Sequence, residues 1–63
     1  MSIQQQVQQF KERNPMGEVR TIEYEGRGVT APISCYRLMH GVMMYGVYDA
    51  KHGYTYYAPE QTH

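Results

Sequence analysis

The first apolar side chains of the chain follow a helical period. Ile3, Val7 and Phe10 recur at intervals of four and three residues, which places them on one face of an α-helix. Glutamines fill most of the positions between them, so the remaining surface of such a helix is polar and largely uncharged. The pattern predicts an amphipathic helix over residues 3–13.

Both ends of this helix carry boundary signals. Ser2 precedes it and Gln5 stands three residues later, which is the S-x-x-Q pattern of a capping box. Pro15 disfavours helical geometry at the residue before it, and Gly17 adds a second break. We therefore expect the helix to begin after Ser2 and to end before Pro15.

From residue 18 onward the apolar positions follow a period of two. The stretch EVRTIEYEG is rich in Val, Thr, Ile and Tyr, which favour strands, so residues 18–25 are predicted to form one. The glycines of EGRGVTAP, closed by Pro32, indicate a loop over residues 26–32.

Three more strands are predicted in the C-terminal half, with a turn at His40 and Gly41. They cover about residues 33–39, 42–49 and 54–58, joined by a short connection at 50–53 and followed by a polar tail at 59–63. The whole chain, residues 1–63, is therefore predicted to be a single small α+β domain. In it, one N-terminal amphipathic helix packs on a small antiparallel sheet of three to four strands, arranged as a meander.

The C-terminal half is unusually rich in tyrosine. Residues 41–59 hold five of the seven tyrosines and only two charged side chains. The strands predicted at 33–39 and 42–49 carry apolar side chains on both faces, whereas a sheet with one solvated face alternates cleanly. A helix about 16 Å long covers only one face. We expect a second copy to cover the other, because twofold homodimers are the commonest oligomers and Tyr and Met are enriched at interface cores.

Composition narrows the class of protein further. Six basic residues balance six acidic ones, which does not match the basic surface of a duplex-DNA binder. The single cysteine excludes an internal disulfide and suits a reducing cytoplasm. The N-terminus lacks the basic and apolar regions of a signal peptide, and no stretch has the length of a membrane span. We therefore expect a cytoplasmic protein without a membrane partner.

Catalytic and metal-binding patterns are absent from the sequence. A nucleophilic Cys35 needs a histidine within hydrogen-bond reach, but His40 lies five residues away and starts on the opposite face of a strand. Cys35, His40 and His52 do not have zinc-site spacing. Asp49 shares a connection with His52, where an aspartate is usually a turn residue. We predict no enzyme, no metal site and no cofactor.

The glycines around Arg27 need a separate interpretation. The stretch YEGRGVTAP lacks the Lys-Ser/Thr pair of a phosphate-binding P-loop, and no predicted helix follows it. Turn geometry explains the glycines, and it leaves Arg27 as an exposed cation available for contact.

These observations favour a small non-enzymatic interaction protein. Such chains act as adaptors, inhibitors or accessory factors, for example in mobile genetic elements, and this one is expected to work as a homodimer on an unidentified macromolecule, with a protein favoured. Exposed cations combined with aromatic anchors are typical of binding hot spots. The contact residues predicted on this basis are Arg27, Arg37, Tyr48, Tyr54, Tyr56 and Tyr57.

Two alternatives stay open at the level of the sequence. The first is a protein that binds single-stranded nucleic acid, stacking bases on tyrosines and contacting phosphates through Arg or Lys. Glu18, Glu23 and Glu25 oppose it, because they weaken the local positive field. The second is a Cys-dependent enzyme built on Cys35.

Overall fold

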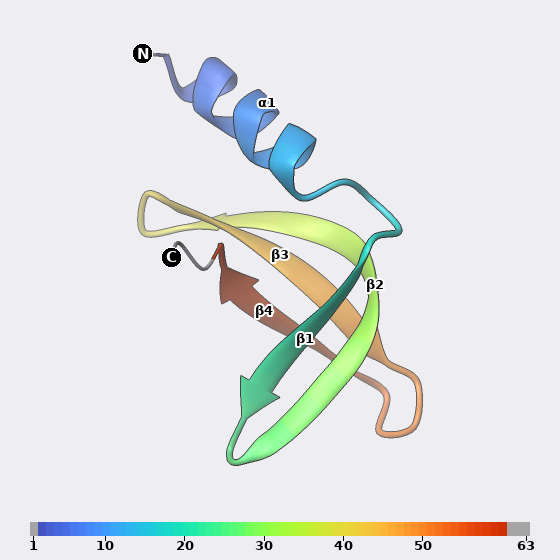
Figure 1. Ribbon diagram of the computed structural model, residues 1–63. Coiled ribbons are helices and arrows are strands. Elements are labelled where there is room, and N and C mark those ends of the chain that lie inside the picture. Colours follow the sequence, from blue (N-terminus) through green and yellow to red (C-terminus); the bar gives the residue numbers. More distant parts are fainter. Residues whose placement is uncertain (1, 61–63) are drawn as a thin grey trace.

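The fold is one helix followed by a four-stranded antiparallel meander (Figure 1). It is seen in a computed structural model that describes residues 2–60, so residues 61–63 of the predicted tail lie outside the described part. The strands pair in the order β1-β2-β3-β4, which confirms the predicted α+β class. The elements are α1 (Ile3–Arg13), β1 (Val19–Tyr24), β2 (Arg27–Met39), β3 (Val42–Asp49) and β4 (Tyr54–Pro59).

The ends of α1 follow the predicted signals. The Ser2 hydroxyl accepts a hydrogen bond from the Gln5 amide at 3.2 Å, and the Gln5 side chain accepts one from the Ser2 amide at 3.3 Å. This reciprocal pair is a capping box. At the other end Asn14, the residue before Pro15, leaves helical geometry with φ −129° and ψ 72°. The helix therefore begins and ends where the sequence places it.

The predicted loop at residues 26–32 is wrong. Glu25 and Gly26 have φ of 50° and 79°, and Tyr24 pairs with Arg27 directly across them. A two-residue hairpin turn with positive φ at both positions matches the twist of its flanking strands, so β2 can begin at once. Gly28 and Pro32, which indicated a loop, lie instead within a strand of 13 residues, and Gly26 lies in the turn before it.

The length of β2 shapes the whole sheet. Its first half pairs with β1 and its second half with β3, and the register shifts between Ile33 and Cys35, where Ser34 is the extra residue. Such a bulge bends its strand and increases the local twist. The sheet consequently curls, and β1 crosses over the concave face toward β4 (Figure 1). The rings of Tyr24 in β1 and Tyr56 in β4 lie 5.0 Å apart.

The hydrophobic core lies inside this curl. Ile22, Ile33, Tyr45 and Val47 are buried, and Val47 is fully shielded from solvent. They come from β1, β2 and β3, so the two halves of the curled sheet bury each other's concave side. The core is small, and cores of this size rarely supply more than about 3–5 kcal/mol.

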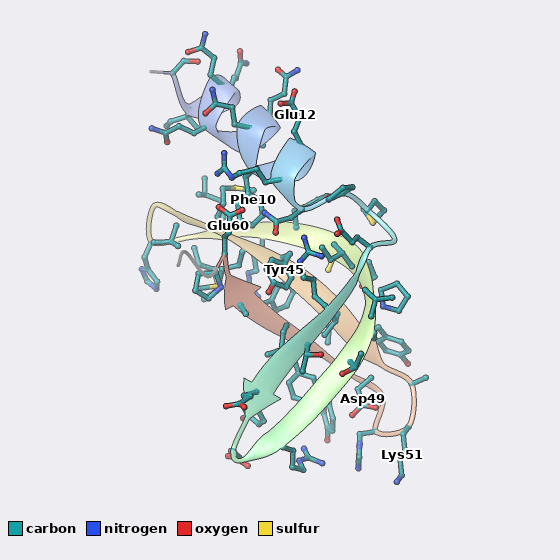
Figure 2. All side chains as sticks on the ribbon, viewed as in Figure 1. Phe10, Glu12, Tyr45, Asp49, Lys51 and Glu60 are labelled. Carbon is teal, nitrogen blue, oxygen red and sulfur yellow. The ribbon has the colours of Figure 1, made fainter. Side chains whose placement is uncertain are left out.

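The helix covers one end of the sheet rather than a whole face. Phe10 is the buried residue of α1, and its ring lies 6.1 Å from that of Tyr36 and 6.3 Å from that of Tyr45. Figure 2 shows Phe10 directed at the sheet while Glu12 points away from it. We expected the helix to cover one face of the sheet and a partner to cover the other, and this expectation therefore needs revision. The curled sheet itself buries most of the surface that the helix was expected to cover.

A polar contact ties the end of α1 to the end of β4. The Glu60 carboxylate accepts hydrogen bonds from Arg13 Nε at 2.9 and 3.0 Å and from Asn14 Nδ2 at 2.9 Å. Desolvation acts to raise the pKa of Glu60, but the hydrogen bonds from Asn14 and Arg13 outweigh it and hold the pKa below its ordinary value. Glu60 therefore stays ionised at neutral pH and anchors the helix.

Candidate functional site

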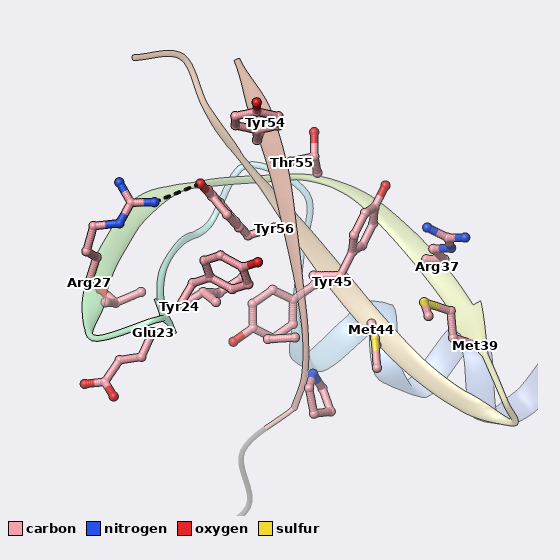
Figure 3. A pocket seen from close by; sticks show the side chains of 15 residues that line it. Glu23, Tyr24, Arg27, Arg37, Met39, Met44, Tyr45, Tyr54, Thr55 and Tyr56 are labelled. Atoms are coloured by element: carbon pink, nitrogen blue, oxygen red, sulfur yellow. Dashed lines mark hydrogen bonds between the residues drawn. The ribbon is translucent and has the colours of Figure 1, made fainter. Parts of the chain in front are cut away.

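The main hollow of the molecule surrounds the edge strand β4. It has a volume of about 820 Å³ and is lined by all six residues of β4, by the β1–β2 hairpin and by parts of β2 and β3. We call this hollow the β4 groove. Successive residues of a strand point to opposite faces, so a groove that contacts every residue of β4 extends along both of its faces. Figure 3 shows Arg27 and Tyr24 on one side of β4, with Arg37 and Met39 on the other.

The concave side of the groove joins an arginine to two tyrosines. Arg27 donates a hydrogen bond to the Tyr56 hydroxyl at 3.3 Å, and the Tyr56 ring packs against Tyr24 (Figure 3). A second nitrogen of Arg27 lies 3.5 Å from His52 Nε2. These contacts hold the β1–β2 hairpin against β4 and fix the position of the Arg27 guanidinium.

The convex side combines another arginine with Tyr57. The Arg37 guanidinium carbon lies 5.4 Å from the centre of the Tyr57 ring, which is cation–π geometry. Cys35 Sγ donates to the Tyr57 hydroxyl at 3.6 Å. The contact with Cys35 is the main cause of a raised pKa of Tyr57, and desolvation acts in the same direction, so the phenol remains neutral. The surface here is aromatic with one fixed cation.

Gly46 of β3 makes this convex side possible. A Cβ at position 46 would lie 2.6 Å from Cys35 Sγ and 2.9 Å from Tyr57 Cε1. Both distances are shorter than real Cβ contacts allow, so the sulfur and the ring occupy the space that any other residue would need. Glycine is present here because the Cys35 sulfur and the Tyr57 ring pack directly against the backbone of β3 at this position.

Five of the six predicted contact residues line the β4 groove. Tyr48 does not, and lies against a separate hollow of about 670 Å³ beside the first half of β2. Tyr24 also lines the groove, but it was not among the contact residues predicted from the sequence. Recognising Glu25 and Gly26 as a two-residue turn would have placed Tyr24 opposite Arg27. The five that line the groove are Arg27, Arg37, Tyr54, Tyr56 and Tyr57.

Asp49 acts as a turn residue. Its carboxylate accepts hydrogen bonds from the Lys51 amide at 3.1 Å and contacts His52 Nδ1 at 2.7 Å. The hydrogen bond with His52 is the main cause of the lowered pKa of Asp49. Between residues 2 and 60, no three His, Cys, Asp or Glu side chains gather as a metal site would need.

Cys35 is half-buried, and its contacts are structural. Its sulfur lies 3.9 Å from the Ser34 hydroxyl, which donates to it, and 3.6 Å from the Tyr57 hydroxyl. His40 occupies the β2–β3 turn with φ 51°, paired with Gly41 at φ 76°. This is the turn predicted from the sequence, and His40 contributes to it by adopting a positive φ.

The groove carries few charges. Its charged lining residues are Glu23, Arg27 and Arg37. Within the described residues neither arginine forms an ion pair, whereas Arg13 and Arg20 each do. The groove thus holds two exposed cations, one beside the Tyr56 hydroxyl and one beside the Tyr57 ring.

Comparisons with known proteins do not add an identity. No protein-family model, no curated protein and no solved structure matches this chain. In the part of the chain that the structure describes, no helix combines the length and apolar character that crossing a membrane would require.

Proposed function

We propose that this protein is a small non-enzymatic interaction module that self-associates as a homodimer and binds a macromolecule, with a protein favoured. The observation that carries the proposal is the β4 groove, a hollow around an edge strand whose 15 lining residues include five tyrosines and two methionines. Hollows of this composition with few, well-placed polar groups are typical of binding surfaces.

The exposure of individual tyrosines supports a contact surface here. Tyr54 is 65% exposed and Tyr24 is 46% exposed in a single copy. Tyrosine contributes much contact area at low entropic cost, and its hydroxyl finds a partner readily. Arg27 is held by a hydrogen bond to the Tyr56 hydroxyl and Arg37 by contact with the Tyr57 ring, which is the pairing of aromatic and arginine that binding hot spots favour.

The balance of charge supports self-association. Six basic and six acidic side chains give no net charge, so two copies do not repel each other strongly. A core this small also gains from a second subunit. The single thiol suits action in a reducing cytoplasm, as an adaptor, inhibitor or accessory factor.

Sedimentation equilibrium tests the homodimer. Between about 5 and 500 μM, where weak dimers with dissociation constants near the micromolar range form, the weight-average mass should rise from one toward two copies of 7.4 kDa. A mass that stays at one copy across this range would overturn the homodimer.

One observation favours single-stranded nucleic acid as an alternative partner. Arg37 lies over Tyr57 and Arg27 contacts Tyr56, so each arginine stands beside a ring on which a base could stack. A labelled oligonucleotide titrated across a salt series separates the two functions. Binding that weakens steadily as salt rises would support the alternative. Absence of binding would leave the protein partner.

A further inference from the structure

The two outer strands of the sheet differ in how they are protected. β1 and β4 are the edges of the meander, and each pairs with one neighbour only. β1 carries Arg20 and Glu23, with Arg20 paired to Glu18 at 2.8 Å. Charged side chains on an edge are a usual device against pairing with another chain. Across its six residues β4 carries no charge.

The outer edge of β4 has backbone N–H and C=O groups that need hydrogen-bond partners. Its ladder runs to β3, and within the described residues no further backbone hydrogen bond involves it. In a strand, alternate N–H and C=O groups point to opposite edges, so half of those in β4 face outward. The β4 groove follows all six residues of β4, so the strand borders open space along its length. A strand edge with outward N–H and C=O groups can bind another extended strand through backbone hydrogen bonds.

We propose that a second copy of this chain adds its own β4 antiparallel to this one, about a twofold axis perpendicular to the sheet. The product is a continuous eight-stranded sheet formed from two four-stranded meanders. This inference rests on the self-association proposed above and names the element that carries it.

In this arrangement the side chains of one β4 strand are complementary to those of the second. A twofold axis perpendicular to the sheet keeps the corresponding faces of the two copies on the same side. It pairs each residue of β4 with the residue of the second copy that lies equally far from the axis on its other side. With Tyr56 on the axis, Tyr54 lies opposite Ala58 of the second copy, and Thr55 lies opposite Tyr57 of the second copy. Both of these pairs join a large side chain to a smaller one, Tyr56 meets Tyr56 of the second copy on the axis, and no pair brings like charges together.

The same arrangement accounts for the exposed tyrosine. Tyr54, the most exposed of the large side chains of β4, would pack beside Ala58 of the second copy instead of standing in water. The two arginines of the β4 groove would then lie along the new strand pair, where the Tyr56 hydroxyl holds Arg27 and the Tyr57 ring holds Arg37. A copy of this chain is therefore a better match than an arbitrary strand.

Backbone N-methylation tests the proposal without changing a side chain. The chain is short enough for total chemical synthesis, with N-methyl groups placed separately at Thr55 and at Tyr56. Neighbouring amides point to opposite edges, so one methyl group faces β3 and the other faces outward. Circular dichroism identifies the variant that keeps the fold, which is the outward one. The same pair of modifications at Thr21 and Ile22 in β1 provides the matched control.

Sedimentation equilibrium of the folded variants gives the outcome. The folded β4 variant should lose at least tenfold in dimer affinity, while the folded β1 variant should dimerise like the unmodified chain. If the β4 variant still dimerises normally, self-association stands and pairing through β4 is overturned. If the unmodified chain is itself a monomer, the homodimer is overturned together with this inference.

Discussion

Replacing Gly46 with alanine should lower the free energy of unfolding by about 1–3 kcal/mol, the usual cost of forcing extra atoms into a packed site. The new Cβ would lie 2.6 Å from Cys35 Sγ, 2.9 Å from Tyr57 Cε1 and 3.1 Å from Thr55 Cγ2. Because the whole domain is expected to hold only about 3–5 kcal/mol, this loss is large. Urea unfolding followed by circular dichroism measures it.

Two controls show whether the close contact is the cause. Gly28→Ala is the matched substitution, since Gly28 also lies in a strand but its Cβ would be 3.6 Å from the nearest atom, an ordinary contact. It should change stability little. Adding Cys35→Ala to Gly46→Ala removes the nearest atom and should recover part of the loss. Equal effects of the two glycine substitutions would contradict the account of position 46.

Replacing Phe10 with alanine should leave much of the protein unfolded at 25 °C. Truncating a buried phenylalanine costs about 3–5 kcal/mol, which equals the stability expected of the whole domain. Phe10 is 4% exposed, and its ring packs against those of Tyr36 and Tyr45. Thermal unfolding followed by far-ultraviolet circular dichroism reports the loss of helix and sheet together.

Substitution of an exposed apolar residue on the same helix separates burial from hydrophobicity. Ile3 is 67% exposed, so Ile3→Ala should shift the midpoint only slightly. Phe10→Leu should be milder than Phe10→Ala, because it retains most of the apolar volume. A folded Phe10→Ala variant with an unchanged midpoint would show that α1 contributes little to the core.

Local signals in the sequence were sufficient for the helix and for one turn. Ser2 and Gln5 form the expected capping box, and the break before Pro15 falls at Asn14. His40 and Gly41 turn the chain between β2 and β3, as expected. These features depend on neighbouring residues alone, so a short window of sequence contains the information that decides them.

The course of β2 could not be read in the same way. Gly28 and Pro32 indicate a loop when taken locally, yet Gly28 pairs with Glu23 and Pro32 with Val19 in a regular ladder. Proline is tolerated there because it lies beside the bulge at Ser34, where β2 changes its pairing partner. Pairing with β1, a contact between separate segments, overrides the local preference.

The β4 groove depends on contacts that are still more distant. Tyr24 meets Tyr56 only because the bulge at Ser34 curls the sheet, and no local pattern reveals that curl. Composition drew attention to the tyrosine-rich region but could not show how its tyrosines divide between the two faces of the sheet. The sequence therefore grouped Tyr48 with Tyr57, although they line different hollows.

Hydrogen exchange of the β4 amides at several protein concentrations tests the central claim most directly, namely that a single copy leaves this edge open and a second copy closes it. Amides that pair between copies are protected only in the dimer. Exchange in residues 54–58 should slow markedly as concentration rises, whereas exchange along β1 should not change. Exchange in β4 that is equally slow, or equally fast, at every concentration would contradict the claim.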